Sequence, residues 1–264
     1  MKPPLLLLFF SLVVATSAHS QIRLAKLELK AREIYKIEGS DILVIDTLIM
    51  HDSSSIVLSH EKKENFIHSK KIIVGKACRI DGSGDDGKPG MNGAKGLSGE
   101  GPCRDGQLGR NGLGGSHGEN GINLFLYCND LQIKGSLIID LSGGDGGNGG
   151  KGGEGGGGSP GTRVCQGGNG GSGGNGSTGG NGGNGANLLI SCKGCPDLLA
   201  MLNRSIFAKS YAGRAGLGGD AGAGGFAGLN PAGDSKQDGK KGLKGKAGAD
   251  GLPGKSGAIN FERN

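Results

Sequence analysis

The chain has 264 residues, 60 of which are glycine, and only 4% of its residues are aromatic. This composition excludes a large conventional hydrophobic core, so we expect backbone hydrogen bonds and cross-links to supply much of the stability. The formal net charge of +6 is spread through sequence of mixed sign without interleaved aromatic residues, which argues against nucleic acid as a partner.

Residues 1–20 have the pattern of a signal peptide. Lys2 precedes the apolar run 5–14, and the small residues Ala18 and Ser20 predict cleavage after Ser20. The apolar run is too short to span a bilayer and no second one follows, so we expect no transmembrane segment. We therefore expect a secreted protein, located in the extracellular space, at the cell surface or in the periplasm; an uncleaved amphipathic anchor helix is the alternative.

Residues 21–80 are rich in β-branched and aliphatic side chains. The runs 41–50, 55–58 and 71–74 are separated by polar turns and predict short strands, as in a β-solenoid-like region or a small β-sandwich. Residues 22–36 also admit a helical start, because their leucines fit neither the strand nor the helix period.

Residues 81–264 contain six glycine ladders, in which glycine recurs at every third position. A period of three matches the polyproline II geometry, with about 3.1 Å rise per residue, so each ladder is expected to be a polyglycine II rod of roughly 45 to 50 Å. The bare faces of such rods let backbones approach closely enough to bond to one another. Numbered 1 to 6 in chain order, the ladders are 84–99, 106–121, 143–158, 170–185, 213–228 and 242–257.

Strand signals return after each pair of ladders, at 122–128, 187–192 and 258–261. The repeating unit is therefore strand, ladder, turn, ladder, strand, with a period of about 60 to 65 residues. We predict a mostly β and irregular fold, in which a strand-rich β-solenoid-like region carries three hairpins of rods packed as a six-rod bundle, two layers of three. A second glycine series in ladders 3 and 4 predicts that the middle hairpin is central.

Three alternatives compete for the glycine-rich region. The segment 242–254 is collagen-like, but a triple helix needs long unbroken triplets and abundant proline, and the chain has 8 prolines. A calcium-binding repeat β-helix would need an apolar position that segments such as 143–148 lack. A flexible linker would not require six ladders of equal length.

All six cysteines are expected to form disulfides in an oxidising compartment. Two of them lie in turns between ladders, at the far tips of the first and second hairpins, and we predict that these two pair with each other. The set is Cys78, Cys103, Cys128, Cys165, Cys192 and Cys195, of which Cys103 and Cys165 are the tip pair.

The other four cysteines lie near strand ends. We predict the pairs Cys78 with Cys128 and Cys192 with Cys195, although other pairings among these four remain open. The CxxC spacing of Cys192 and Cys195 is also that of a redox pair, but it follows a strand in an exported chain, which favours a structural clip. A zinc site would need further clustered ligands, so we expect no metal.

Catalytic patterns are sparse. The run 51–54 reads His-Asp-Ser-Ser, but a triad is defined by geometry across a fold, and the run is explained as a polar turn. Asp81, Asp85 and Asp86 suit a solvated turn as well as a weak cation site. We expect no catalytic residue, no cofactor and no enzyme activity; an enzyme with its site in residues 22–80 is a distant alternative.

Triplet-glycine rods joined by turn cysteines resemble the snow-flea antifreeze proteins, whose fold is six polyproline-type helices in two stacks of three. The ladders are also similar to the polyglycine bundle at the tip of phage receptor-binding adhesins, and to collagen-like secreted proteins of bacteria. The resemblance covers the three hairpins and not the first 80 residues. An antifreeze face is flat and made of small side chains, whereas the following charged positions lie in or beside the ladders: Asp86, Lys88, Lys95, Glu100, Lys240, Lys241 and Lys244.

From these resemblances we expect a non-enzymatic secreted or cell-surface module with a structural or adhesive role, possessing a protein or glycan partner and serving as a subunit of an outer-surface or outer-membrane-associated assembly. The turns 100–105, 159–166 and 229–238 are the expected binding tips, because loops vary while a scaffold stays fixed. The alternative is ice or polysaccharide binding by the flat faces of the bundle.

Overall fold

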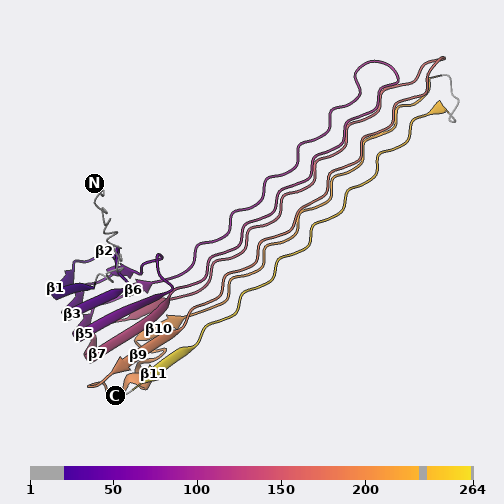
Figure 1. Ribbon diagram of the computed structural model, residues 1–264. Coiled ribbons are helices and arrows are strands. Elements are labelled where there is room, and N and C mark those ends of the chain that lie inside the picture. Colours follow the sequence, from indigo (N-terminus) through magenta and orange to yellow (C-terminus); the bar gives the residue numbers. More distant parts are fainter. Residues whose placement is uncertain (1–20, 232–236, 263–264) are drawn as a thin grey trace, which may run out of the picture.

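The computed structural model describes residues 21–231 and 237–262, so the predicted signal peptide lies outside the described residues. Two parallel β-sheets lie at one end of the molecule, and the glycine ladders extend from them side by side (Figure 1). The described residues contain almost no helix, which confirms the prediction of a mostly β protein.

The larger sheet has six strands in the order β1-β3-β5-β7-β9-β11, and the smaller sheet has five in the order β10-β8-β6-β4-β2. Successive strands therefore alternate between the two sheets. The larger sheet contains β1 (Ile22–Leu29), β3 (Ile42–Met50), β5 (Glu64–Val74), β7 (Asn123–Ile133), β9 (Leu188–Cys192) and β11 (Ile259–Glu262). The smaller sheet contains β2 (Ile34–Lys36), β4 (Ser55–Val57), β6 (Cys78–Asp81), β8 (Leu137–Asp140) and β10 (Ile206–Lys209). One short helix, α1 (Leu198–Met201), precedes β10.

Strands at both ends of the described chain belong to the same two sheets. β1 and β2 show that residues 22–36 start as strand, so the helical alternative is wrong there. The strands after the ladders extend the sheets begun by β1–β6, because β7 pairs with β5 and β8 pairs with β6.

Apolar side chains stack in columns between the sheets. Because the strands are parallel and in register, one residue from each strand of the larger sheet continues the same column. The inner members of that column are almost fully buried, and each buried aliphatic side chain contributes about 1.5 to 3 kcal/mol. The column consists of Ile22, Leu43, Ile67, Leu126, Ile190 and Phe261.

The three ladder hairpins occupy equivalent positions in the fold. Each one connects a strand of the smaller sheet to the next strand of the larger sheet: β6 to β7, β8 to β9 and β10 to β11. Earlier in the chain, the corresponding connections from β2 to β3 and from β4 to β5 are short loops, residues 37–41 and 58–63. The hairpins therefore leave the sheets on one side and run together (Figure 1).

Glycine amides bond the ladders to one another along their length. Within a layer the bonded ladders are parallel, as when the Gly87 N–H donates to the Asp145 carbonyl at 2.7 Å. Between layers they are antiparallel, as when the Gly147 N–H donates to the Ser116 carbonyl at 2.9 Å. These bonds place ladders 1, 3 and 5 in one layer and ladders 2, 4 and 6 in the other. Ladders 3 and 4 each bond to four other ladders.

The ladder glycines are required for close approach and not for unusual backbone angles. Among the described glycines, only Gly39 and Gly101 have positive φ, and both lie outside the ladders. A Cβ atom on Gly150 would overlap the carbonyl oxygen of Met91 in the neighbouring ladder. By contrast, a Cβ atom on Gly114 would have no neighbour closer than 3.6 Å.

Candidate functional site

The tips of the three hairpins are tied to one another. A disulfide joins Cys103 to Cys165, with a Cα–Cα distance of 6.1 Å, as the sequence predicts for these two residues. The Cys103 N–H also donates to the Pro160 carbonyl at 2.9 Å. The second tip is bonded to the third, because the Gly161 N–H donates to the Leu229 carbonyl at 3.0 Å. The tips therefore form one connected surface at the distal end of the ladders.

Large hydrophobic side chains are exposed at this distal surface. The exposed fraction is 93% for Val164, 78% for Phe226 and 66% for Leu229. The Lys241 ammonium lies 5.8 Å from the centre of the Phe226 ring, within the range of a cation–π interaction. Side chains this exposed at the tips of connected loops are candidates for contact with a partner. Part of the predicted third tip, 232–236, lies outside the described residues.

A second candidate surface is the outer face of the layer formed by ladders 2, 4 and 6, which we call the amide face. Side chains of ladder 4 accept hydrogen bonds from backbone N–H groups of ladder 6. The Lys246 N–H donates to Asn175 Oδ1 at 2.8 Å, and the Leu252 N–H donates to Asn181 Oδ1 at 2.9 Å. Asn184 repeats the contact with Lys255 at 2.8 Å. Each of these exposed asparagines therefore turns its carbonyl oxygen toward ladder 6 and retains amide N–H donors.

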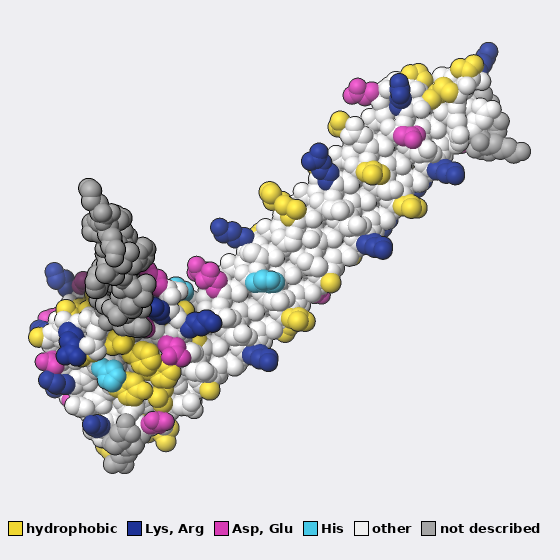
Figure 2. Space-filling model, viewed as in Figure 1, with side chains coloured by type: hydrophobic (Ala, Val, Ile, Leu, Met, Phe, Trp, Pro, Cys, Tyr) yellow, Lys and Arg dark blue, Asp and Glu magenta, His cyan; other side chains and the backbone are white. Residues whose placement is uncertain are grey.

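Ladder 2 makes the corresponding contacts to ladder 4. The Asn175 N–H donates to Asn111 Oδ1 at 2.8 Å, and the Asn181 N–H donates to His117 Nδ1 at 2.7 Å. Ladder 4 has no charged residue, whereas ladder 6 has three lysines and one aspartate and is preceded by Lys240 and Lys241. In Figure 2, most of the visible face of the ladders is white, with a histidine and, near the distal end, an acidic side chain on it, and lysine or arginine side chains alternate with hydrophobic ones along its edges.

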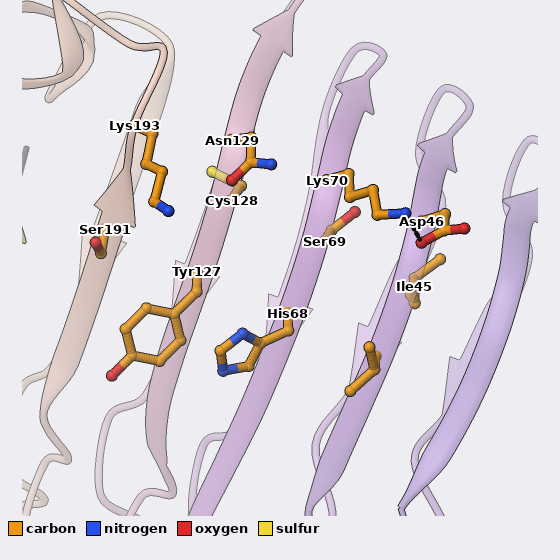
Figure 3. Close-up of a pocket in the computed structure, with 11 residues that line it drawn as sticks. Ile45, Asp46, His68, Ser69, Lys70, Tyr127, Cys128, Asn129, Ser191 and Lys193 are labelled. Atoms are coloured by element: carbon orange, nitrogen blue, oxygen red, sulfur yellow. Dashed lines mark ion pairs between the residues drawn. The ribbon is translucent and has the colours of Figure 1, made fainter. Parts of the chain in front are cut away.

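A groove crosses the outer side of the larger sheet, over β3, β5, β7 and β9 (Figure 3). Its volume is about 280 Å³. The rings of His68 and Tyr127 stack with their centres 4.5 Å apart, and Lys70 pairs with Asp46 at 2.8 Å. Cys128 lines the same groove.

The predicted pair Cys78 with Cys128 is wrong. Cys78 lies on β6 in the smaller sheet, and its Sγ contacts the backbone carbonyl of His51 at 3.2 Å. Cys128 lies on β7 in the larger sheet, where its neighbour in register is Cys192 of β9. The two residues thus belong to different sheets, and both are free and buried. The structure contains the other predicted disulfide at this end, Cys192 with Cys195.

Cys128 lies beside that disulfide. The Sγ atoms of Cys128, Cys192 and Cys195 are all within 4.8 Å of one another, and they form the one group of potential metal ligands found in the described part of the chain. Burial, reinforced by the negative charge of Asp130, raises the pKa of Cys128 to about 12. In the sequence these cysteines all lie near predicted strand ends, but nothing there brings Cys128 to the disulfide, because parallel pairing of β7 with β9 cannot be read from local spacing.

Side chains of the turn 51–54 contact neighbouring strands and turns and do not form a triad with one another. His51 Nε2 lies 2.9 Å from Glu28 Oε1, and this contact together with the ion pair to Lys26 lowers the pKa of Glu28 to about 2. Asp52 accepts the Lys76 N–H at 2.8 Å, and Ser54 Oγ lies 3.9 Å from the Cys78 sulfur.

The acidic residues at the start of ladder 1 are also engaged. Asp81 pairs with Arg79 at 3.2 Å and accepts the Ser83 hydroxyl at 2.8 Å. Asp86 accepts the Asp145 N–H at 2.7 Å. The Asp85 carbonyl accepts the Glu119 N–H at 2.9 Å. Their polar contacts therefore serve the junction between sheet and ladders.

Within the described ranges, 21–231 and 237–262, no helix has the length and apolar character needed to cross a membrane. Comparison of the chain with protein-family models, curated proteins and solved structures finds no match.

Proposed function

We propose that this protein is a non-enzymatic secreted or cell-surface module with a structural or adhesive role, which holds a binding tip away from its sheet region. The observation that carries the proposal is the connection of three hairpin tips by the Cys103–Cys165 disulfide and by backbone hydrogen bonds. Fixing the tips before binding lowers the entropy lost when a partner is bound.

In the same proposal the ladders are polyglycine II rods packed as a six-rod bundle, and the two parallel sheets are a β-solenoid that carries it. Support comes from the threefold glycine period and from glycine N–H groups that bond neighbouring ladders along their length. A rod of this kind would hold the tips roughly 45 to 50 Å from the sheets. A spacer of that length suits a subunit of an outer-surface assembly with a protein or glycan partner.

Pull-down from cell envelopes with two matched double variants tests the adhesive role. Val164→Asp with Phe226→Asp places charge on the tip, whereas Met91→Asp with Leu113→Asp places the same charge on exposed positions along the ladders. We expect the tip variant to lose at least tenfold of the recovered partner and the ladder variant to retain it. Equal recovery from both variants would contradict a binding role for the tip.

A second candidate function is polysaccharide binding along the amide face. It is favoured by the row of exposed asparagines on an uncharged ladder, beside the lysines of ladder 6. Amide donors suit hydroxyl and carboxylate oxygens, and the lysines would attract an anionic polymer. The lysines of ladder 6 are unlike the small side chains of an antifreeze ice-binding face. A thermal hysteresis measurement distinguishes ice from polysaccharide as the ligand.

Retention on an immobilised anionic polysaccharide tests this second function. Lys246→Gln with Lys255→Gln removes two charges from ladder 6, and Lys62→Gln with Lys63→Gln removes the same charge from the sheet region. We expect the first variant to elute at clearly lower salt than the second, since interactions between exposed charges are screened by salt. Identical elution of the two variants would argue against the amide face.

A further inference from the structure

Three cysteine sulfurs meet at the edge of the larger sheet although only two of them are bonded. Cys128 and Cys192 are direct neighbours on the parallel strands β7 and β9, and Cys195 follows in the turn after β9. All three residues are at most 4% exposed, and their sulfurs lie within 4.8 Å of one another. We propose that these cysteines form one exchangeable disulfide site, in which the bond moves between Cys192–Cys195 and Cys128–Cys192.

The turn that carries Cys195 is held against β7. The Lys193 N–H donates to the Cys128 carbonyl at 3.1 Å, and the Gly194 N–H donates to the Asn129 carbonyl at 2.7 Å. A Cβ atom on Gly194 would come within 2.5 Å of that same carbonyl oxygen, so only glycine fits the approach. These contacts keep the disulfide next to the third thiol in the folded protein.

The exchange is a redox-neutral reaction within the chain. The Cys128 thiolate attacks Sγ of Cys192, a new bond forms between these two sulfurs, and the Cys192–Cys195 bond breaks. Cys195 leaves with the electron pair as a thiolate and takes up one proton, which replaces the proton that Cys128 released. No external oxidant or reductant is needed.

The two bonded states differ in what they connect and in where the free thiol lies. The Cys192–Cys195 bond closes a local turn, whereas a Cys128–Cys192 bond would link β7 to β9. The free thiol would move from Cys128, which lines the groove in Figure 3, to Cys195. Cys195 borders a separate cavity of about 350 Å³, together with Leu198 and Phe261. Exchange would thus present a thiol to a different surface.

Protonation of Cys128 controls the rate. Because burial keeps its thiol protonated at neutral pH, the attacking thiolate is scarce there and becomes more abundant as the pH rises. The state with the bond between Cys192 and Cys195 is therefore expected to persist at neutral pH, and exchange is expected to accelerate under alkaline conditions.

Disulfide mapping by mass spectrometry of Cys195→Ser, secreted and purified without reductant, tests the site. We expect a Cys128–Cys192 bond in nearly all molecules of this variant, because removal of Cys195 leaves Cys192 beside only one other thiol. The matched control is Cys78→Ser, in which the Cys192–Cys195 bond should be unchanged. Free thiols at both Cys128 and Cys192 in a folded Cys195→Ser protein would overturn the proposal.

A measurement on the unmodified protein covers the case in which the variant fails to fold. The protein is incubated at pH 7 or pH 10, quenched with acid, denatured and labelled with a maleimide. We expect the label on Cys78 and Cys128 at pH 7, and at pH 10 a growing share on Cys195 with a matching loss from Cys128. Label confined to Cys78 and Cys128 after prolonged incubation at pH 10 would overturn exchange.

Discussion

Glycine acts in this protein mainly through the space that it leaves for a neighbouring backbone. A methyl group on Gly112 would overlap the Gly150 carbonyl oxygen of ladder 3. Two residues further along, Gly114 occupies the third position of its triplet, and the nearest atom to an added Cβ is 3.6 Å away. Adjacent glycines of one ladder therefore differ in their tolerance of a side chain.

The variants Gly112→Ala and Gly114→Ala form a matched pair within ladder 2. We expect Gly112→Ala to lower the free energy of unfolding by about 1 to 3 kcal/mol, because the added methyl group must push two backbones apart. Gly114→Ala should be neutral or stabilising by up to about 1 kcal/mol, since it reduces the entropy of the unfolded chain. Denaturant unfolding measures both; equal effects would show that the ladders are not closely packed.

The buried thiol of Cys128 predicts a pH dependence of stability. Its pKa rises from 9.0 to about 12 on folding, so its stabilising effect is complete below pH 9 and is lost as the pH rises toward 12. In Cys128→Ala we expect a shallower loss of unfolding free energy between pH 8 and pH 11 than in the unmodified protein. Parallel pH profiles for the two proteins would contradict the burial of this thiol.

At the scale of elements, the three hairpins depend on ties at their distal ends. The Cys103–Cys165 disulfide closes a loop with a sequence separation of 62. The chain-entropy description gives about 4 kcal/mol for a loop of this length. We expect Cys103→Ser with Cys165→Ser to lower the unfolding free energy by up to that amount. The control Cys78→Ser removes a free cysteine and no disulfide, so it should not show this effect. Unchanged denaturant midpoints in the double variant would show that hydrogen bonds alone hold the tips together.

The connections between the sheets predict that a hairpin is dispensable for strand pairing. Residues 58–63 make the same type of connection as a complete hairpin, from the smaller sheet to the larger. Replacing 211–258 by a loop about as long as residues 58–63 should therefore leave the strand content of the rest of the protein unchanged in far-ultraviolet circular dichroism. Loss of the strand signal would mean that the ladders are needed for the sheets to form.

Local patterns in the sequence predicted the elements better than their pairing. The run of β-branched and aliphatic residues over 41–50 predicted a strand, which is β3, and the position of Cys103 and Cys165 in turns predicted their disulfide. The error over Cys78 and Cys128 arose because both lie near the ends of the predicted strands, whereas Cys128 is in the middle of β7. Assignment to one sheet or the other depends on the whole alternating path of the chain. The amide face was also missed, although the repeated asparagine in the glycine triplets of ladder 4 was a visible signal.

At the scale of the whole molecule, sheets and ladders follow one pattern of addition. From β6 onward, each repeat of strand, two ladders and strand adds one strand to each sheet and one ladder to each layer. Neighbours in the sheets are therefore also neighbours among the ladders. The apolar columns stabilise one end, and backbone hydrogen bonds connect the other. Together they place the tips at a distance from the sheets, which is the basis of the proposed structural or adhesive role.

Hydrogen exchange of the glycine amides, resolved by NMR, tests most directly whether the ladders form one hydrogen-bonded bundle. In ladders 3 and 4, Gly147, Gly150, Gly171 and Gly174 donate to carbonyls of other ladders, and all four are expected to exchange slowly. Their protection should be lost together on global unfolding. Exchange of these four amides at the rate of an unfolded chain, in a protein whose strand amides remain protected, would contradict the bundle and leave the ladders as linkers.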